Sequence, residues 1–325
     1  MSIVFTHRRF GGRIENGTKE HPFLIKDAFD FIAFIQEIDS GNDFEGIYHQ
    51  VVKDLDFEYL DIIGIKQNPY RGLFDGNFKT FKNINLIFLR NDNSVGLRCL
   101  FGDNYGTIKN LRFKNINIQS SVNYSSVICV TNYGNISNIS VQGQGVATED
   151  AFSSVLVELG SSNVKDIYSD VTINAPNSKW MGGIAACSYS QPHFLTNCFS
   201  KCNIVGYSHI GGICGFTTNS SQNTIVRNSV SAMSNLKSTL SGSTFRISAG
   251  TLNSNNYSLE DTMINNAIPT TNIGTNSQNG ADATELQLKS TKFYRDVLGW
   301  DMDTIWEIEI EGVTFPRLRG FDYNF

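Results

Sequence analysis

Three aspartates near the start of the chain could supply carboxylates for sugar hydrolysis: Asp54, Asp56 and Asp75. A glycosidase needs two such groups, one to protonate the leaving oxygen and one to act as base or nucleophile. However, Asp75-Gly76-Asn77 is a turn sequence, and Asp54 and Asp56 flank Leu55 in an alternating strand pattern. We therefore predict structural roles for all three aspartates.

No other set of reactive side chains has the spacing of a known catalytic or metal site. The five histidines are scattered, and no serine or cysteine lies in a nucleophile motif with a partner base. Calcium would need carboxylate-rich turns, whereas the turns here are mostly Asn, Ser and Gly. We expect a protein without catalytic residues, metal or cofactor. A glycan-degrading enzyme with carboxylates converging in one groove is the alternative.

The six cysteines are expected to be buried thiols. Four of them lie in apolar runs of different repeats, where a small hydrophobic side chain packs well. Cys198 and Cys202 are near neighbours without histidine partners, and disulfides or metal binding remain the weaker alternatives. Buried thiols suit a protein that folds in a reducing cytoplasm. The four cysteines in apolar runs are Cys99, Cys129, Cys187 and Cys214.

A line of tyrosines is the candidate ligand-binding site. Tyr105 and Tyr133 are 28 residues apart, and Tyr189 follows 56 residues later, with Ser161 at the position between them. Residues one coil apart in a stack of strands lie about 4.8 Å apart. The rings would therefore stack, either packing a corner of the fold or forming an exposed strip that grips a glycan chain by its apolar faces. The exposure of the three rings distinguishes these interpretations.

These tyrosines belong to a repeat that covers the middle of the chain. An Asn or Asp follows a hydrophobic-polar pair at positions spaced by 28, 28, 31 and 31 residues. One step of 27 earlier lies Asn83, and one step of 28 later lies Asn256. A fixed period of this size indicates a solenoid. The repeated positions are Asn110, Asn138, Asp166, Asn197 and Asn228.

Each repeat contains a short apolar run, a Gly/Asn/Ser turn and a second, alternating run such as residues 108–118. Alternation with a period of two predicts strands with one buried face, and the breaks between runs are too short for a crossover helix. Strands that stack without helices form a parallel β-helix. The repeated Asn would occupy one bend in each coil, bonded to the backbone or to the Asn of the next coil.

A helical pattern near the N-terminus predicts a cap. Residues 27–38 follow a short strand at residues 22–25, with Asp27 as the N-cap and Gly41 as the stop. Such a helix would cover the open end of the core, where bare strand edges invite aggregation. The apolar face of this helix comprises Phe31, Phe34, Ile35 and Ile38.

A second helical pattern, residues 284–298, predicts a C-terminal cap after a polar loop. Trp300, Trp306 and Phe315 are expected in a final strand pair. The fold class is therefore all-β: a single-domain parallel β-helix with a capping helix at its start and a helix-plus-strand cap at its end. The predicted regions are the lead-in with its cap (residues 1–95), the repeat array (96–266) and the C-terminal cap (267–325).

The chain resembles the GLUG-motif repeat proteins at both ends. Residues 17–25, GTKEHPFLI, are followed by the helix, by DLD at 54–56 and by LFDGNFKTFKNI at 73–84. This order is similar to the family's lead-in, G-T-x-x-x-P-[YF]-x-I, helix, D-[IL]-D and F-D-G-N-x-x-T-I-x-N-L. The C-terminal end is also similar to the family pattern, which closes with L-G-W-[DN], then W and then G-x-P-x-L. This chain has LGWD at 298–301, a later Trp and then GVTFPRL.

The middle of the chain is similar to the family repeat with less specific matches. GGICG at 211–215 stands where the family has G-G-L-V-G, and NSVS at 228–231 where it has N-S-Y-S. The units around Val155 and Phe245 depart from the glycine pattern. The resemblance covers roughly residues 11–320 and implies a β-helical passenger-type domain, as in bacterial surface adhesins and protease precursors. It implies binding or display and brings no catalytic set.

The composition of the chain limits the kinds of partner that we expect it to bind. The chain has 26 Lys and Arg against 31 Asp and Glu, a net charge of −5, and no basic block, so we expect no nucleic-acid partner. No apolar run approaches the roughly 20 residues needed to cross a bilayer, and we expect no membrane insertion. No apolar signal-peptide region follows Met1, which favours synthesis in the cytoplasm without export.

Fold and compartment together favour a non-enzymatic binding or structural protein. We expect a phage or phage-like virion component of the tail or fibre, or an attachment protein that recognises a cell-surface glycan. A bacterial surface adhesin is the alternative, with location at the cell surface rather than the virion. The expected partners are other structural proteins of a larger assembly, docked through residues 5–13 or 322–325, and a cell-surface polysaccharide.

Overall fold

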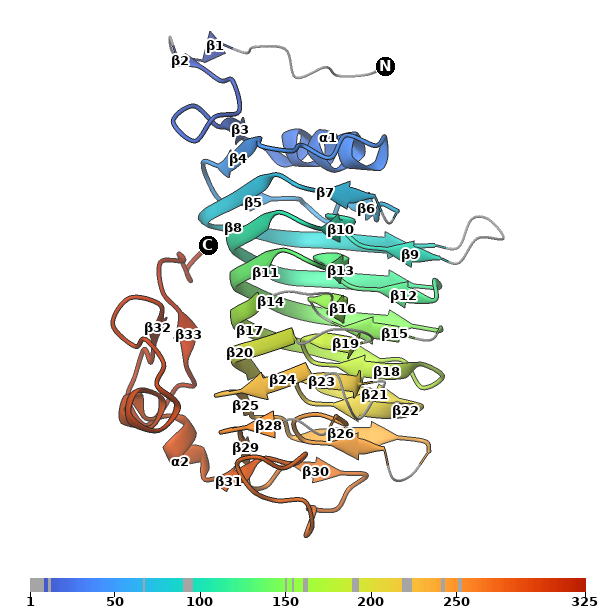
Figure 1. Ribbon diagram of the computed structural model, residues 1–325, viewed down its shortest axis with the longest axis vertical. Coiled ribbons are helices and arrows are strands. Elements are labelled where there is room, and N and C mark those ends of the chain that lie inside the picture. The colour runs from blue at the N-terminus through green and yellow to red at the C-terminus, as the bar shows by residue number, and fades with distance from the viewer. Residues whose placement is uncertain are drawn as a thin grey trace.

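The chain winds into a parallel β-helix whose rungs stack along one axis, as Figure 1 shows. The predicted all-β parallel β-helix is therefore confirmed. The register follows the predicted repeat, because Ile136 pairs with Ile108 on one side and with Val164 on the other. This computed structural model describes residues 9–10, 13–66, 68–89, 96–149, 151–153, 155–159, 163–188, 193–217, 224–240, 243–250 and 253–325.

The rungs form three parallel sheets, here called sheets I, II and III. Sheet I contains β3 (Phe23–Ile25), β4 (Tyr48–Val51), β5 (Leu55–Asp56), β6 (Asp61–Ile63), β8 (Leu73–Phe88), β11 (Thr107–Ser120), β14 (Asn135–Ala147), β17 (Asn163–Asn174), β20 (His193–Ser200), β21 (Asn203–Gly206), β24 (Thr224–Arg227), β25 (Val230–Ser231), β26 (Asn235–Ser238), β28 (Asn253–Ser254), β29 (Tyr257–Leu259), β30 (Met263–Ile264) and β31 (Ala281–Ala283). Sheet II contains β7 (Pro69–Tyr70), β10 (Asp103–Asn104), β13 (Cys129–Asn132), β16 (Leu156–Leu159), β19 (Ala185–Ser188) and β23 (Cys214–Thr217). Sheet III contains β9 (Leu97–Arg98), β12 (Tyr124–Ser125), β15 (Ala151–Ser153), β18 (Lys179–Gly182), β22 (Ser208–Gly211) and β27 (Thr244–Phe245).

The ladder of sheet I is longer than the predicted array of residues 96–266. It already includes β8 before that range and continues to β31, which pairs with β29 after it. The difference arises because the predicted boundaries followed the asparagine repeat, whereas parallel pairing needs only matched strands. Two short antiparallel pairs lie outside the three sheets: β1 (Arg9–Phe10) with β2 (Arg13–Ile14), and β32 (Trp306–Glu307) with β33 (Arg317–Leu318).

Asparagines in the left-handed conformation bend the long strands of sheet I. At the repeated positions φ lies between 49° and 58°, a region that Asn and Asp tolerate better than other non-glycine residues. The side chains bond from rung to rung. Asn138 Nδ2 donates to Asn110 Oδ1 over 2.9 Å, and Asn197 Nδ2 donates to Asp166 Oδ1 over 3.3 Å. The predicted asparagine ladder is thus confirmed in the middle of the solenoid.

The N-terminal end of this ladder differs from the prediction. Asp75 rather than Asn83 precedes Asn110, because Asn110 Nδ2 donates to Asp75 Oδ1 over 2.9 Å. Asn83 belongs to a second ladder, in which Asn115 Nδ2 donates to Asn83 Oδ1 over 2.6 Å. The shift arises because residues 76–78 together stand opposite a single residue of β11.

The C-terminal end of the ladder also differs by one residue. Asn255 has a φ of 54°, and its Nδ2 donates to Asn228 Oδ1 over 3.0 Å. The predicted Asn256 is buried instead, where its Nδ2 donates to the carbonyl of Val226 over 2.6 Å and its Oδ1 accepts from Ser229 N over 2.9 Å. Asn256 therefore holds the same bend from inside the solenoid.

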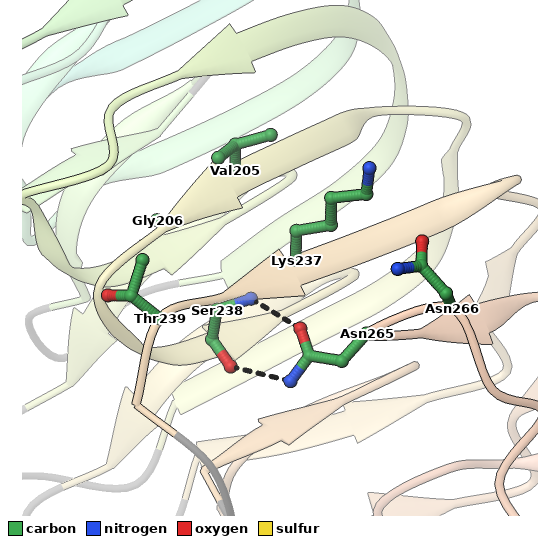
Figure 2. A pocket seen from close by; sticks show the side chains of 7 residues that line it. All are labelled: Val205, Gly206, Lys237, Ser238, Thr239, Asn265 and Asn266. Carbon is green, nitrogen blue, oxygen red and sulfur yellow. Dashed lines mark hydrogen bonds between the residues drawn. The ribbon is translucent and has the colours of Figure 1, made fainter.

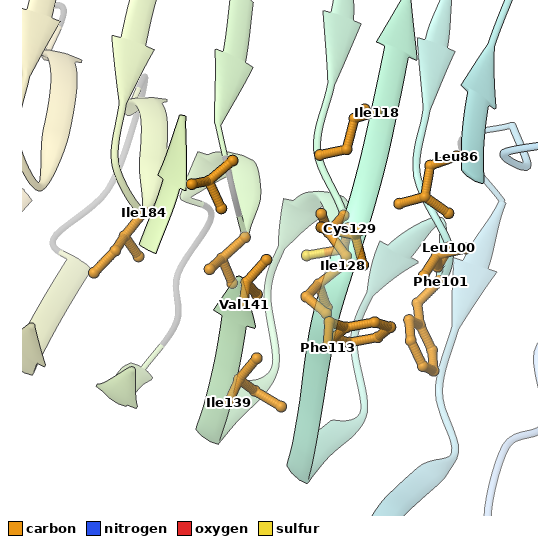
Figure 3. Close-up of a cluster of buried hydrophobic side chains, with 14 of the residues drawn as sticks. Leu86, Leu100, Phe101, Phe113, Ile118, Ile128, Cys129, Ile139, Val141 and Ile184 are labelled. Atoms are coloured by element: carbon orange, nitrogen blue, oxygen red, sulfur yellow. The ribbon is translucent and has the colours of Figure 1, made fainter. Parts of the chain in front are cut away.

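Apolar side chains on the inner faces of the sheets fill the solenoid. Figure 3 shows them arranged rung above rung, with Leu86 level with Ile118, as the register requires. Both side chains are fully buried. Burying one such side chain contributes about 1.5–3 kcal/mol, so a continuous column of them stabilises neighbouring rungs against separation.

The described cysteines confirm the prediction of buried thiols. None of the five forms a disulfide, and burial is the main reason that the pKa of Cys99 and of Cys214 is raised to about 12. These thiols therefore stay protonated and unreactive at neutral pH. The side chain of Cys187 lies outside the described residues. The five buried thiols are Cys99, Cys129, Cys198, Cys202 and Cys214.

Helix α1 (Ala28–Asp39) closes the N-terminal end of the core, as predicted. Asp27 Oδ1 accepts the backbone N–H of Asp30 over 2.8 Å, which caps the first turn. Phe31 lies with its ring 4.9 Å from that of Phe81, and Phe34 lies 5.2 Å from Phe74. The helix thus packs on aromatic side chains of β8, at the open end of the stack.

A buried arginine secures the other end of the solenoid. Arg246 is 0% exposed, and its Nη2 forms an ion pair with Asp282 Oδ1 at 2.6 Å. Its Nε donates to the carbonyl of Asn279 over 3.0 Å, and its Nη1 donates to that of Leu259 over 3.3 Å. This single side chain therefore ties β31 and the preceding loop to the last rungs.

The C-terminal segment, residues 284–325, runs back along the flank of sheet I towards the first rungs (Figure 1). Trp300 Nε1 donates to the carbonyl of Asn228 over 2.7 Å, and Trp306 Nε1 donates to Asp166 Oδ1 over 3.3 Å. Further along, Arg112 Nη1 donates to the carbonyl of Asp322 over 3.3 Å. The predicted helix-plus-strand region is present and extends along the solenoid beyond its end.

The elements of this segment are shorter than predicted. The expected helix at 284–298 is two pieces, α2 (Glu285–Leu288) and the π-helical turn η1 (Phe293–Leu298). Of the three aromatic residues expected in the strand pair, only Trp306 lies in a strand. Trp300 and Phe315 instead pack against sheet I and η1, because contact with the solenoid outweighs pairing within the segment.

Candidate binding surface

The Asn-Tyr-Gly turns between sheets II and I place their three residues in three different environments. Asn104 and Asn132 are fully buried, and Asn104 Nδ2 donates to Asn132 Oδ1 over 2.6 Å. Asn104 Oδ1 also accepts the N–H of Gly106 over 3.0 Å. The amide side chain thus holds the turn from inside, and the tyrosine that follows it points outward.

The glycines allow successive turns to lie in close contact. A Cβ on Gly106 would lie 2.0 Å from the carbonyl oxygen of Gly72, and one on Gly134 would lie 2.1 Å from that of Gly106. No other residue fits such a backbone approach. The tight stacking of these turns brings the residues before the glycines into register along the axis.

Tyr105 and Tyr133 form an exposed stack, which we call the tyrosine ladder. Their side chains are 42% and 43% exposed, and their ring centroids lie 4.6 Å apart at an interplanar angle of 15°. The predicted stacking of these two rings is confirmed. Tyr189 and Ser161, which the sequence placed on the same line, lie outside the described residues.

Arg71 extends the ladder by one rung, which sequence reasoning missed. Its guanidinium carbon lies 4.6 Å from the centroid of the Tyr105 ring, and its Nε lies 3.2 Å from Asp43 Oδ2. Tyr70 pairs with Asn104, so Arg71 takes the position of a ladder tyrosine. The sequence feature that could have identified this position is Gly72, which follows Arg71 as Gly106 follows Tyr105.

This geometry determines what the ladder presents to a ligand. Tyr105 has Arg71 against one ring face and Tyr133 against the other, so a sugar cannot stack on either face in the way the sequence suggested. The outward surface consists of ring edges, phenol hydroxyls and the Arg71–Asp43 pair. These groups donate and accept hydrogen bonds at intervals set by the rung spacing, about 4.8 Å.

The aspartates proposed as structural are engaged in holding turns. Asp54 Oδ1 accepts the N–H of Thr80 over 2.6 Å, and Asp75 Oδ1 accepts that of Asn77 over 2.8 Å. Burial alone would raise the pKa of Asp56. Hydrogen bonds from the Glu58 backbone and other groups outweigh the effect of burial, so the pKa of Asp56 is lowered. A general acid needs a raised pKa, which Asp56 lacks, and Asp54 and Asp75 are instead bonded to backbone N–H groups of turns.

The described histidines offer no accessible base beside a nucleophile. His49 is fully buried among aromatic rings. His209 Nδ1 lies 3.0 Å from Ser208 Oγ, but Ser208 is only 1% exposed and cannot meet a substrate. No group of three or more His, Cys, Asp or Glu side chains that could hold a metal occurs in the described ranges. Nor does any described helix have the length and apolar character to span a membrane.

A surface hollow near the last rungs was not apparent from the sequence. It has a volume of about 460 Å³ and crosses β21, β26 and the residues after β30. Figure 2 shows Asn265 bound to Ser238, with Ser238 N donating to Asn265 Oδ1 over 2.8 Å. The lining has amides, hydroxyls and one lysine, and no carboxylate. The lining residues are Val205, Gly206, Lys237, Ser238, Thr239, Asn265 and Asn266.

Comparison with known proteins agrees with the fold class. No protein-family model matches the chain, and no curated protein matches it. A solved structure, "putative immunoglobulin A1 protease from Bacteroides ovatus", is similar with a TM-score of 0.75 and 21% sequence identity, over 94% of each chain. At this identity the likeness concerns the fold alone. The chain is a β-helical repeat protein, with an elongated flank that displays side chains at a regular interval.

Proposed function

We propose that this protein is a non-catalytic binding module that recognises a glycan along the tyrosine ladder. The observation that carries the proposal is the exposed stack of Tyr105 and Tyr133, continued by Arg71. A row of hydroxyls and ring edges one rung apart suits an extended chain of sugar units, each bearing hydroxyls of its own. A rigid scaffold presents them without the entropy cost of ordering a loop.

The proposed contacts are hydrogen bonds rather than ring stacking. The phenol hydroxyls can donate and accept, and the Arg71 guanidinium adds donors beside the Asp43 carboxylate. Because Arg71 and Asp43 neutralise each other, a neutral glycan fits this surface better than a strongly acidic one. The exposed ion pair itself contributes little to stability, so its polar atoms are available to a ligand.

We propose further that the protein serves attachment, as part of a virion tail or fibre or as a bacterial surface adhesin of the GLUG-repeat type. A solenoid that displays one binding flank and leaves its ends to partners suits either setting. Detection of the protein by immunogold labelling on purified particles would favour the virion setting. Labelling confined to bacterial envelopes would favour the adhesin setting.

Degradation of the glycan is the alternative function, and the named protease activity of the solved β-helical structure is another. Among the described residues, Asp54 and Asp75 are bonded to backbone N–H groups that hold turns, and no group of three or more side chains that could hold a metal occurs. Incubation with bacterial polysaccharides and with immunoglobulin A1 tests both. Cleavage of any of them at a useful rate would overturn the non-catalytic proposal.

A glycan array tests the binding proposal directly. The variant Tyr105→Phe/Tyr133→Phe keeps the stacked rings and removes only the hydroxyls. Two lost hydrogen bonds of about 0.5–1.5 kcal/mol each should weaken binding several-fold or more, with an unchanged melting temperature. Phe29→Ala, which removes a 72% exposed aromatic side chain on α1, is the matched control and should bind normally. Normal binding by the double variant would refute this role for the ladder.

A further inference from the structure

We infer that Asp166 makes the asparagine ladder sensitive to pH. In its neutral form the carboxyl group donates a hydrogen bond to Asn138 Oδ1 and completes the ladder, and in its ionised form it leaves this link unmade. The link lies where the ladder of sheet I meets the C-terminal segment, because Trp306 of that segment also bonds to Asp166. The inference goes beyond the proposed function and does not depend on a glycan ligand.

The hydrogen bonds at this end of the ladder run in one direction. Asn138 Nδ2 donates to Asn110 Oδ1, and Asn110 Nδ2 donates to Asp75 Oδ1, each over 2.9 Å. The direction is fixed at Asp75, because a carboxylate accepts hydrogen bonds and cannot donate one. Turning either amide round would set one oxygen against another. Asn138 Oδ1 is therefore the acceptor left for a donor from the next rung.

The next rung holds an aspartate in place of an asparagine. The residues on both sides of Asn138 pair with the residues on both sides of Asp166, so the two are level in β14 and β17. Both have left-handed backbone, with φ of 54° and 58°. Asn138 Oδ1 is buried and has no hydrogen-bond partner. An ionised Asp166 cannot supply one, because it carries no proton.

One proton resolves this shortage of donors. Three links join the four successive members of the ladder from Asp75 to Asp166, and the two amides between them donate across two of these links. With both carboxyl groups ionised, only acceptors meet at the third link. A buried acceptor without a donor is destabilising. A neutral Asp166 supplies the missing donor without a change in the backbone.

The other hydrogen bonds of Asp166 leave one of its oxygens for this proton. Asn197 Nδ2 and Trp306 Nε1 both donate to Oδ1, each over 3.3 Å. The described residues give Asp166 Oδ2 no hydrogen bond. A proton on Oδ2 therefore leaves both existing bonds in place, and the carboxyl group accepts through one oxygen while it donates through the other.

The surroundings of Asp166 favour its neutral form. The side chain is 1% exposed, and burial raises its pKa. The charge of Asp301 in the C-terminal segment raises the pKa further, whereas the two hydrogen-bond donors and the charge of Lys165 offset only part of the rise. On the adjacent rungs, β14 contains no titratable residue and β20 contributes the thiol of Cys198.

Proton uptake and docking of the C-terminal segment therefore favour each other. The segment sets the fully buried Trp306 against Asp166 and brings Asp301 near it. Burial and the Asp301 charge both favour the proton, and by thermodynamic reciprocity the proton favours the docked segment. The hydrogen bond from Trp306 acts in the opposite direction, but its effect on the pKa is smaller than that of burial.

The sign of the effect on stability follows from proton linkage. The pKa of Asp166 in the folded protein lies above the unfolded value of about 3.9. The stabilisation from this link is therefore complete below about pH 3.9 and is lost as the pH rises through the folded pKa.

Asp166→Asn tests the inference, because an amide supplies the donor at every pH. Its oxygen can still accept from Asn197 and Trp306, and its Nδ2 can donate to Asn138. In urea titrations at pH 8 the ratio of folded to unfolded protein should be roughly 3- to 10-fold higher than for the natural sequence. This advantage should shrink at pH 6.5 and again at pH 5.

The matched control is Asp75→Asn, which makes the same change at the other carboxylate of the ladder. Asp75 has the Lys109 ammonium 3.2 Å away, and its Oδ1 already accepts from Asn77 N and Asn110 Nδ2. An amide there removes the ion pair and completes no link, so Asp75→Asn should give no gain in stability at pH 8.

A double-mutant cycle assigns the gain to the proposed link. Asn138→Gly tolerates the left-handed backbone and removes the acceptor, so Asp166→Asn should give no gain in that background. If Asp166→Asn alone is less stable than the natural sequence at pH 8, fails to fold, or gives a gain that does not change with pH, the inference is overturned and Asp166 is an ordinary ionised acceptor. A gain that persists beside Asn138→Gly also overturns it.

Discussion

Acidification should destabilise this protein through one buried histidine at the N-terminal end. His49 is 0% exposed, and its ring lies 4.6 Å from the rings of Phe34 and Phe44 and 5.8 Å from that of Phe23. Neither ring nitrogen has a hydrogen-bond partner among the described residues. Burial lowers the pKa of His49 to about 3, because a charge in this aromatic surrounding would have no compensating partner.

The sign and size of the effect follow from proton linkage. Below the ordinary histidine pKa of about 6.5, the unfolded chain binds a proton that the folded chain does not, so unfolding becomes more favourable as the pH falls. The stability is complete above about pH 6.5 and declines towards pH 3. Each pH unit costs about 1.4 kcal/mol, so the loss attributable to His49 at pH 5 is about 2 kcal/mol.

Urea denaturation followed by circular dichroism at pH 7.5, 6 and 5 measures this loss. His49→Phe keeps an aromatic ring in the cavity and removes the titrating group, so its free energy of unfolding should fall less between pH 7.5 and pH 5, by about 2 kcal/mol. Asp166, whose pKa burial raises, contributes with the opposite sign in both proteins and cancels in the difference.

The matched control is His21→Gln, at an exposed position, which should retain the pH dependence of the natural sequence. Should Phe prove too large for the site, His49→Leu replaces it in the same comparison. Parallel pH profiles for the natural sequence and the His49 variant would refute the reasoning.

Three further substitutions probe the scaffold. Arg246→Met leaves buried carbonyl oxygens without a donor and should lower the free energy of unfolding by about 3 kcal/mol in urea titrations. Arg246→Lys should restore part of this loss. If Arg246→Met is as stable as the natural sequence, Arg246 does not hold the last rungs together. Gly106→Ala places a methyl group 2.0 Å from the Gly72 carbonyl and should lower the melting temperature markedly, by about 3 kcal/mol of stability, unless the turns stack less closely than described. Trp306→Phe removes the hydrogen bond to Asp166 and should cost about 1–2 kcal/mol, seen as faster proteolysis of the C-terminal segment; an unchanged cleavage rate would show that packing alone holds it.

Features that depend on local conformation could be predicted from the sequence. The repeated Asn positions required left-handed backbone once per coil, which Asn and Asp tolerate, and the resulting period of about 28 residues identified the solenoid. The apolar face of α1 followed in the same way from its spacing. Local backbone preference and periodicity are properties of short stretches of chain, so both can be predicted from the sequence without the tertiary structure.

Rung-to-rung register was decided by the tertiary structure. The sequence predicted that Asn83, 27 residues earlier, precedes Asn110. Residues 76–78 stand opposite a single residue of β11, so Asp75 takes that position instead. Arg71 joined the tyrosine ladder because Gly72 stacks beneath Gly106, although its side chain has no resemblance to tyrosine.

The orientation of the aromatic rings likewise could not be predicted from the sequence. A spacing of 28 residues predicts that Tyr105 and Tyr133 stack, but whether the ring faces meet a ligand depends on the side chains of the neighbouring rungs. In this protein Arg71 and Tyr133 cover the two faces of Tyr105. The sequence determined the coil and its bends through local backbone preference, and only the contacts between coils decided which surface each aromatic side chain presents.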